Sequence, residues 1–469
     1  MRQNGVKPPH STWRTFVPQW FANIFLNMSA LFPRNFRKEF PVVVRGEGCW
    51  IVVADGRRYL DASGQAAVVN IGHGVKEIAE AIAAQAGQVA FAHTTQFHSE
   101  AAEKLAARLL ALAPGNFQNG GRVYFTSGGS EATETAIKLA RQYHLERGET
   151  SRYRVISRRQ SYHGSTVGAM SVSGNVGRRA PYAPLLAEWG HIAPCFCFHC
   201  PFDKKFPECG IACADDLSNF LSSDHPETAA AFIFEPVVGA TLGAVAPPDG
   251  YAQRIAQICR AQGILLVADE IMTGMGRTGK LFAVNHWGVE PDLILVGKGV
   301  ASGYAPLGAV LVSAKVADAF AKGSRVFQHG FTYQAHPVST AAGKAVLDYL
   351  ENHNLFERVS PAAAQLRAAL ARLQDHPHVG EIRGLGLLMG IEFVMDRQTR
   401  EPFPRETNIA EKIMQAALTK NVLTYPSQGC VDGLRGDHIL LAPPFIISAD
   451  LCSQIAQALE FAVAQVFAS

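Results

Sequence analysis

The stretch Leu265–Gly299 begins LLVADEIMTGMGRTGK and ends PDLILVGKG, and it sets an acid and a lysine 29 residues apart. The run Gly263–Ala268 is apolar and ends at Asp269, and the run Asp292–Val296 leads to Lys298. A short apolar run closed by a charged residue predicts a buried parallel strand that delivers this residue to its carboxyl end. Open α/β sheets bind ligands at that edge, so we expect Asp269 and Lys298 to meet across one site. This pair suits pyridoxal 5'-phosphate (PLP), which needs a Schiff-base amine and a carboxylate for its ring nitrogen.

The composition excludes several classes of protein. The chain has 469 residues, of which 48% are hydrophobic and 18% charged, so it is long enough for one large and one smaller globular domain. A net charge of +3 without a basic tract gives no reason to expect a nucleic-acid partner. Nine cysteines without a signal peptide favour a reducing, cytoplasmic location. The uncharged stretch 15–33 is interrupted by Pro18, Gln19, Asn23 and Asn27, so we expect an aromatic arm on the body or on a partner subunit, and no membrane anchor.

The pattern of apolar runs predicts an α/β fold in two domains. Strands expected at 122–126, 153–157, 229–234, 264–268, 293–296 and 308–312 alternate with helices such as 130–146 and 251–262. This alternation is typical of a mostly parallel sheet covered by helices. After residue 336 the pattern becomes that of a smaller α+β domain, with helices expected at 338–351, 361–373, 408–420 and from 449, and a strand at 384–393. We therefore predict an N-terminal arm and part of the small domain in 1–60, a large domain in 61–335 and the rest of the small domain in 336–469.

A glycine-rich turn follows the strand expected at 122–126. It reads Ser127-Gly128-Gly129-Ser130-Glu131-Ala132 and opens a helix. Glycines allow close backbone approach, hydroxyls donate hydrogen bonds, and a helix N-terminus favours an anion. The turn lacks the closing Gly-Lys-Ser/Thr of a Walker loop. It indicates either a phosphate cup of another kind or an ordinary structural turn.

Three further side chains can complete a cofactor site. Tyr162, followed by His163, comes after the strand expected at 153–157 and can stack on a planar ring. Ile271, two residues after Asp269, can press on the opposite ring face. Thr332 lies in a loop just before the change of pattern and can reach a phosphate across a dimer interface. Taken alone, a tyrosine at such a position is more often a packing residue, and Ile271 is equally compatible with an ordinary core. Spacing alone does not assign Thr332 to a phosphate.

Five of the nine cysteines fall in a short insert at 195–213, together with His199. The pairs Cys197-x-x-Cys200 and Cys209-x-x-x-Cys213 have the spacing of a structural tetrathiolate zinc site. The alternative is a set of reduced thiols in a surface insert. In either case we expect this cluster to have a structural or interfacial role and no part in catalysis.

Together these features resemble the class III (subgroup II) aminotransferases of PLP fold type I, over nearly the whole chain. The shared motifs occur in the family's order, namely Gly46-Glu47-Gly48, Asp55 to Asp61, Asn70-Ile71-Gly72-His73-Gly74 and Ala442-Pro443-Pro444. The resemblance implies that Lys298 forms the Schiff base with PLP and that Asp269 pairs with the pyridine nitrogen. It further implies that the remaining cofactor contacts come from Tyr162 and Ile271 on the two ring faces, and from Ser127, Gly128, Gly129, His163 and Glu235. Thr332 would serve the neighbouring subunit's site, which implies a homodimer or tetramer with shared active sites.

Departures from the family pattern narrow the expected reaction. Ala240 stands where ornithine- and GABA-type members carry a second glutamate, and Leu440 stands where many members place a carboxylate-binding arginine. Met272 replaces a glutamine that often reaches the cofactor's phenolic oxygen. The segment Arg435-Gly436-Asp437-His438 resembles the ω-amino acid and amine:pyruvate branch, which makes Arg435 the candidate for binding the acceptor carboxylate; a solvent-facing loop arginine is the alternative. We expect a transaminase that moves an amino group from an ω-amino acid, amine or diamine to a keto acid, pyruvate, by a ping-pong mechanism.

Other activities on the same scaffold stay open. Ser63-Gly64-Gln65 resembles the dialkylglycine decarboxylase segment whose glutamine assists the loss of CO₂, so decarboxylation-dependent transamination is an alternative. Aminomutase chemistry is another. A non-catalytic binding module of this fold would usually lack the lysine, and Lys298 is present. Trp50 and the aromatic arm are candidates for lining the pocket of a bulky or apolar amine.

Overall fold

The structure, a computed structural model, describes residues 30–468. Val43–Ser469 form one compact unit, separate from the unit that ends at Val42. The expected aromatic arm falls largely in residues 1–29, outside the described part of the chain. Within the described part, no helix combines the length and the apolar character needed to span a membrane.

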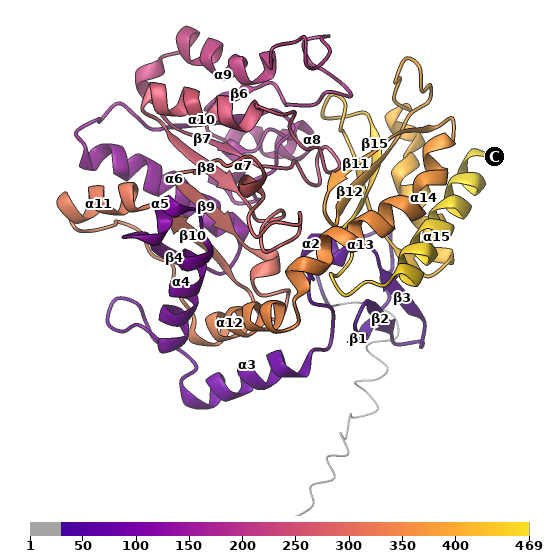
Figure 1. The fold of residues 1–469 in the computed structure, drawn as a ribbon, viewed down its shortest axis with the longest axis horizontal. Helices are drawn as coiled ribbons and strands as arrows, with labels where there is room; N and C mark the ends of the chain where they lie inside the picture. The colour runs from indigo at the N-terminus through magenta and orange to yellow at the C-terminus, as the bar shows by residue number, and fades with distance from the viewer. Residues whose placement is uncertain (1–29, 469) are drawn as a thin grey trace, which may run out of the picture. The chain divides into compact units, whose positions relative to one another are not determined.

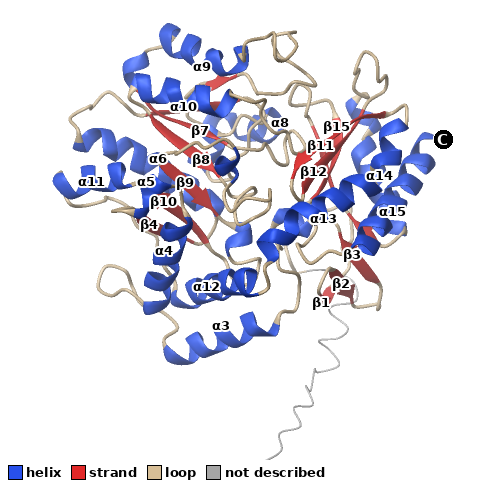
Figure 2. Cartoon of the chain, in the orientation of Figure 1, coloured by secondary structure: helices blue, strands red, loops and turns tan. Residues whose placement is uncertain are grey.

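A seven-stranded sheet forms the centre of the larger part of the unit, with helices on both faces (Figures 1 and 2). Its strand order is β4-β10-β9-β8-β7-β5-β6. The strands β5 to β9 pair in parallel, whereas β10 runs antiparallel to both β9 and β4. The bounds are β4 Arg122–Thr126, β5 Arg154–Arg158, β6 His191–Ile192, β7 Ala229–Phe234, β8 Leu265–Asp269, β9 Leu293–Val296 and β10 Gly308–Val312. This is the mostly parallel, doubly covered sheet that the alternating pattern predicts.

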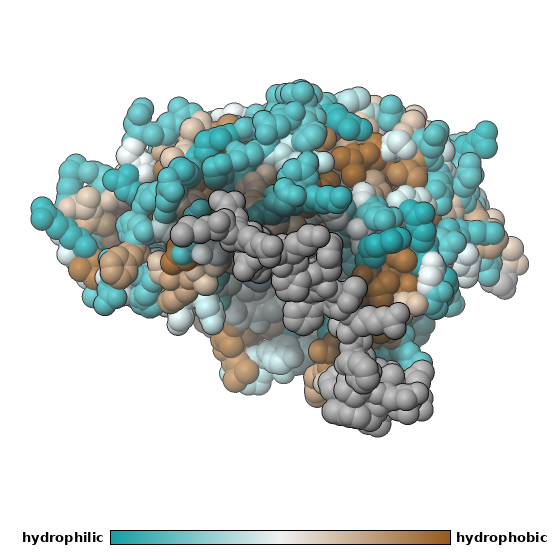
Figure 3. Space-filling view, turned by 90° about the horizontal axis from the view of Figure 1, so that it is seen from below, coloured by the Kyte–Doolittle hydropathy of each residue, from teal (hydrophilic) through white to brown (hydrophobic). Residues whose placement is uncertain are grey.

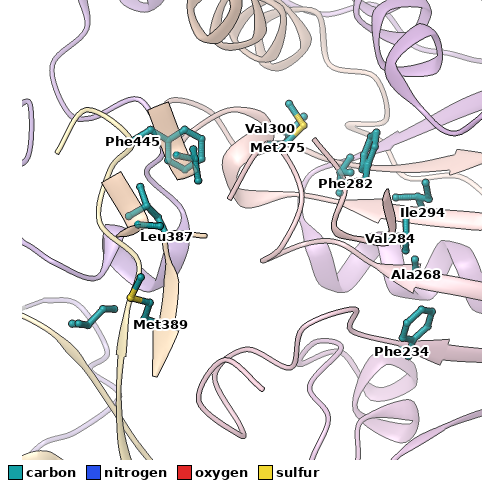
Figure 4. Close-up of a cluster of buried hydrophobic side chains, with 14 of the residues drawn as sticks. Phe234, Ala268, Met275, Phe282, Val284, Ile294, Val300, Leu387, Met389 and Phe445 are labelled. Carbon is teal, nitrogen blue, oxygen red and sulfur yellow. The ribbon is translucent and has the colours of Figure 1, made fainter. Parts of the chain in front are cut away.

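The apolar runs are continuous because both faces of this sheet are buried. Alternate residues of β8 enter two different cores: Leu265 and Val267 pack with helix α6, whereas Leu266 and Ala268 face the opposite side. Figure 4 shows part of the second core, with Phe234, Ala268 and Ile294 projecting from neighbouring strands.

The helices of the larger part are α2 Gly64–Ala67, α3 Lys76–Gln88, α4 Glu100–Leu112, α5 Gly115–Gln118, α6 Gly129–Glu146, α7 Val167–Val172, α8 Val176–Arg179, α9 Ala212–Ser223, α10 Tyr251–Gln262, α11 Ala314–Lys322 and α12 Pro337–Asn352.

Two four-stranded sheets lie in the smaller part. One has the order β1-β2-β3-β13, so that β13, late in the chain, pairs in parallel with β3 near its start. The other has the order β11-β12-β15-β14 and packs with helices α13 to α15 (Figure 1). The bounds are β1 Val43–Glu47, β2 Trp50–Val53, β3 Arg58–Asp61, β11 Val379–Leu385, β12 Leu388–Phe393, β13 Val422–Leu423, β14 Tyr425–Gln428, β15 Asp437–Leu441, α13 Leu355–Ala369, α14 Ile409–Thr419 and α15 Ala449–Phe467. The domain boundaries at 60 and 335 stay a prediction.

Two elements differ from the sequence-based expectation. The helix expected at 361–373 begins earlier, at Leu355, and contains Pro361 in its interior. The strand expected at 384–393 is a hairpin, because the chain reverses between β11 and β12 at Gly386, which has φ +58°.

The face of the molecule seen in Figure 3 is mostly hydrophilic. On this face, hydrophobic residues form separate patches among hydrophilic ones. Near the start of the described chain, Leu31, Phe32, Phe36 and Phe40 are all more than half exposed.

Candidate active site

The strand topology brings the expected site residues to one edge of the central sheet. Asp269 ends β8 and is paired in parallel with Leu295 of β9, and Lys298 follows β9 directly. Glu235 follows the parallel neighbour β7. Because β10 is antiparallel to both β9 and β4, the carboxyl end of β4 and the turn at Ser127 lie at the same edge. The carboxyl ends of these strands therefore surround one site.

The Asp269 carboxylate is buried and held by two donors. Its Oδ2 accepts a hydrogen bond from His163 Nδ1 at 2.7 Å, and its Oδ1 accepts one from the Ile271 backbone N–H at 3.1 Å. Since the carboxylate can only accept, Nδ1 of His163 carries the proton. His163 Nε2 is buried and has no hydrogen-bond partner among the described residues. Both acceptor oxygens of Asp269 are thus oriented by fixed groups.

Glu235 connects two backbone segments. Its Oε1 accepts a hydrogen bond from the Tyr162 N–H at 3.0 Å, and its Oε2 accepts one from the Gly239 N–H at 3.0 Å. Burial raises the pKa of this carboxyl, and Asp269 adds to the rise, while His163 opposes it. Glu235 therefore fixes the loop that carries Tyr162.

The amine of Lys298 is set for nucleophilic chemistry. Lys298 lies half-buried between two glycines, with a left-handed φ of +44°. Burial lowers its pKa to about 8; Asp269 and Glu235 oppose this shift, and Arg178 and Arg277 add to it. About half of the free amine is therefore unprotonated at pH 8.

Glycines make room beside this lysine. A Cβ at Gly129 or at Gly297 would lie 3.1 Å from Ile271 Cδ1, so the Ile271 side chain fills the space that larger residues would occupy. A Cβ at Gly128 would meet nothing within 4 Å, so the turn is open there. The turn leads into the 18-residue helix α6, whose N-terminus favours an anion. The amine of Lys298, the oriented carboxylate of Asp269 and the open turn at the α6 N-terminus fit the aldehyde, the ring nitrogen and the phosphate of PLP, in that order.

Two other expected cofactor residues have the following contacts in the structure. The Tyr162 hydroxyl lies 2.9 Å from Ser165 Oγ, and its ring faces the Arg178 guanidinium, with 4.4 Å between the guanidinium carbon and the ring centroid. Thr332 is exposed and forms no hydrogen bond with the 127–129 turn of the same chain. Its expected role at a neighbouring subunit's site stays a prediction.

The three candidate substrate residues have other contacts in this structure. Arg435 is about half exposed; its Nε lies 2.7 Å from Asp432 Oδ2 and its Nη1 lies 3.5 Å from Glu401 Oε1. The Trp50 ring is covered by a guanidinium, with the carbon of Arg58 5.1 Å from its centroid. Gln65 is exposed and has a left-handed backbone conformation. Its backbone N–H donates a hydrogen bond to the Asp61 carboxylate.

Two of the positions that depart from the family pattern, Ala240 and Leu440, are buried, and the third, Met272, is partly buried. Leu440 lies in an apolar cluster with Val237, Leu388 and Met272. The Ala240 carbonyl accepts a hydrogen bond from His438 Nε2 at 3.0 Å. Neither position offers a charged group to a ligand.

Two arginines near the site carry no signal in the sequence. Arg277 is buried and donates to the carbonyls of Val69, Leu387 and Pro443. Arg178 lies in the short helix α8 beside Tyr162. Nothing in residue spacing marks either one, because both reach the site through tertiary packing.

The structure gives no support to the expected zinc site. No group of three or more His, Cys, Asp or Glu side chains within residues 30–468 is placed to hold a metal ion. Cys197, Cys200, Cys209 and Cys213 are free thiols. Burial raises the pKa of Cys197 to about 11 and also raises that of Cys213, and the neighbouring cysteines add to both shifts. The prediction of a structural zinc ion is therefore corrected to a cluster of reduced cysteines.

The chain is similar over most of its length to proteins of one family. The family model described as Aminotransferase class-III matches residues 32–463. The chain is 38% identical to an uncharacterized aminotransferase of Bacillus subtilis, over 90% of this chain and 94% of that protein. It is 34% identical to an adenosylmethionine-8-amino-7-oxononanoate aminotransferase of Nitratidesulfovibrio vulgaris, over 87% of this chain and 74% of that protein.

Solved structures give the same result. A thermostable (S)-enantioselective omega-transaminase from Thermomicrobium roseum matches with a TM-score of 0.87 and 38% identity, over 93% of this chain and 96% of that one. An amine transaminase from an uncultivated Pseudomonas species, in a PLP-bound form, matches with a TM-score of 0.86 and 35% identity, over 93% of this chain and 98% of that one.

Proposed function

The chain belongs to the class III aminotransferases and is a PLP-dependent enzyme of fold type I, and from this premise we propose that it transfers an amino group from an ω-amino acid, amine or diamine to pyruvate by a ping-pong mechanism. The observation that carries the proposal is the placement of Asp269 and Lys298 at the carboxyl ends of adjacent parallel strands. The choice of pyruvate is supported by Ala240 and Leu440, which stand where other members carry charged groups.

We propose that the described residues hold PLP in three places. Lys298 would attach it, Asp269 would pair with its ring nitrogen, and the turn at Gly128 and Gly129 would hold its phosphate. Tyr162 and Ile271 would contact the two ring faces. Bound PLP would supply an aldehyde that condenses with amines and a ring that accepts electron density.

Lys298 is the proposed general acid and base. Its lowered pKa, about 8, lets the free amine take up and release a proton near neutral pH. Asp269 would stabilise positive charge at the ring nitrogen of bound PLP, and His163 and Ile271 already orient both of its oxygens. Glu235 fixes the Tyr162 backbone and so positions the aromatic ring.

We further propose a homodimer with shared active sites, in a reducing cytoplasm. The assembly is supported by three exposed aromatic side chains, Phe91, Phe97 and Tyr333, of which Phe91 and Tyr333 have ring centroids 6.0 Å apart. Thr332, which precedes Tyr333 in the chain, is exposed, so a second subunit can reach it. The cytoplasmic location is supported by nine free thiols.

A donor panel with two keto acids tests the proposed reaction. Purified holoenzyme is incubated with ω-amino acids, diamines and simple amines, against pyruvate and 2-oxoglutarate in parallel, and the amino acid formed is quantified. We expect alanine formation to exceed glutamate formation clearly. A strong preference for 2-oxoglutarate would contradict the choice of pyruvate, and CO₂ release from 2-aminoisobutyrate would instead indicate the decarboxylating reaction.

One relative suggests a further pair for the same panel. The similarity to an adenosylmethionine-8-amino-7-oxononanoate aminotransferase makes adenosylmethionine a donor and 8-amino-7-oxononanoate an acceptor to include. If that pair is turned over at a higher kcat/KM than any amine with pyruvate, it replaces the proposed substrates.

Size-exclusion chromatography with light scattering tests the proposed homodimer. A monomer at micromolar concentration would contradict it.

A further inference from the structure

Arg178 brings a positive charge to the site from a short helix. It lies in α8, where the Asn175 side chain accepts a hydrogen bond from the Arg178 backbone N–H at 3.0 Å. Its guanidinium carbon is 4.4 Å from the centroid of the Tyr162 ring. The arginine is also near enough to Lys298 to disfavour the charged form of that amine. The Arg178 guanidinium therefore stacks on the Tyr162 ring and lies close enough to Lys298 to influence the charge of its amine.

This guanidinium has no anionic partner. It forms no ion pair or side-chain hydrogen bond with any residue in 30–468. Other arginines around the site are fully engaged: Arg277 donates to three carbonyls, and Arg383 is paired with Glu392 at 2.5 Å. Its neighbour Arg179 turns away, with Nη1 3.4 Å from His191 Nε2. A half-buried guanidinium that has no ion-pair partner among the described residues is available to pair with an anion.

The turn expected to supply the substrate arginine packs directly against α8. A Cβ at Gly433 would lie 3.1 Å from Val176 Cγ2, and a Cβ at Gly177 would lie 3.6 Å from the Gly433 carbonyl oxygen. Arg435, on the same turn, is held by Asp432 and Glu401. At the contact between α8 and this turn, the cation that faces Tyr162 is therefore Arg178 and not Arg435.

We propose that Arg178 binds the carboxylate of the substrate, and so selects a small α-keto acid as acceptor. This inference rests on the proposed transaminase function. The planar guanidinium offers two parallel N–H donors to a carboxylate, and the Tyr162 ring supports its apolar face. A donor amine without a carboxylate does not use this contact, and the guanidinium then stays stacked on Tyr162. One site can thus accept both an amine donor and a keto acid.

The test separates the two half-reactions of the holoenzyme. Arg178→Gln removes the charge, Arg178→Lys keeps the charge without the fork, and Arg179→Gln is the matched control on the same helix. For each variant, rates are measured with L-alanine, with a carboxylate-free amine and with pyruvate. We expect Arg178→Gln to lower kcat/KM for L-alanine and pyruvate by about ten- to a hundredfold, as expected for a lost charge-assisted pair. The rate with the carboxylate-free amine should change less than about threefold, and Arg178→Lys should fall in between.

A binding measurement keeps the inference separate from the proposed reaction. Propionate carries the carboxylate but no reactive carbonyl, and its affinity for wild-type and Arg178→Gln holoenzyme is measured by calorimetry. Weaker propionate binding in Arg178→Gln supports the inference, even if no donor is turned over and the proposed function fails. Three results would overturn the inference. The first is an unchanged propionate affinity in Arg178→Gln, and the second is an equal loss of rate with all substrates together with weaker PLP binding. The third is that Arg435→Gln, instead of Arg178→Gln, loses pyruvate binding.

Discussion

Replacing Asp269 by Asn tests whether this carboxylate governs the chemistry. Asp269 is 4% exposed, and its two oxygens accept hydrogen bonds from His163 Nδ1 and the Ile271 N–H. An Asn has a single acceptor oxygen, so one of these donors would face an amide NH₂ group. His163 can move its proton to Nε2, but that nitrogen has no partner among the described residues. The variant therefore loses a charge and also strains the hydrogen bonding around it.

The expected loss of rate follows from the charge. Opposite charges about 4 Å apart at an effective dielectric constant near 20 attract by roughly 4 kcal/mol. Hydrogen bonding that the Asn retains reduces this figure, so we expect Asp269→Asn to lose about 2–4 kcal/mol of transition-state stabilisation. This corresponds to a rate of transamination lower by about 30- to 1000-fold. PLP should still attach to Lys298, so the visible absorbance of the bound cofactor should persist.

Glu270 provides a control from the next position in the chain. It is also buried, and it accepts hydrogen bonds from the Val284 N–H at 2.9 Å and from the Thr273 hydroxyl. Burial raises the pKa of Glu270 to about 7, and the Thr273 hydroxyl can reverse its role, so a Gln is tolerated there. Stopped-flow absorbance of the first half-reaction compares the two variants. Asp269→Asn within about threefold of wild type, or Glu270→Gln as impaired as Asp269→Asn, would refute the reasoning.

Three further outcomes follow from the same contacts. Burial lowers the pKa of Lys298 from 10.5 to about 8, so between these pH values the unfolded apoenzyme binds more protons than the folded one. The free energy of unfolding, measured with urea, should therefore fall by about 1–3 kcal/mol as the pH falls through this window. Lys298→Met should remove this pH dependence. Arg383→Met removes the arginine partner of the buried Glu392 carboxylate and leaves His199 Nε2, at 2.5 Å, so it should cost about 3–5 kcal/mol in the same assay; adding Glu392→Met should recover part of the loss. Gly129→Ala places a Cβ 3.1 Å from Ile271 Cδ1 and should lower PLP affinity by about tenfold in fluorescence titrations; Ile271→Val in the same chain should restore part of it.

The strands were predictable because both faces of the central sheet are buried. Burial on two sides gives continuous apolar runs, and the runs before Asp269 and Lys298 coincide with β8 and β9 to within a residue or two. The start of α13 was not predictable from Pro361. Proline is common in the first turn of a helix, yet here it lies inside a helix whose buried Leu355 and Val359 begin the packed face earlier.

The position of Asp269 and Lys298 at the ligand edge of the sheet was predictable, whereas the contacts of Arg435 and Arg178 were not. A charged residue at the end of a buried parallel strand must reach the ligand edge, and this rule places Asp269 and Lys298 without any tertiary information. Arg435 was chosen from a local pattern, but its partners include Glu401, which lies 34 residues away. Arg178 depends on how α8 packs against another turn. Pairing across such distances is not encoded in local spacing.

The most direct test of the account is the position at which the cofactor is attached. Holoenzyme is reduced with borohydride and digested, and the peptide that carries the pyridoxyl group is identified by mass spectrometry. The account predicts one modified residue, Lys298, and no modification of the same peptide in Lys298→Ala. Attachment to another lysine, or no borohydride-stable label at all, would contradict it.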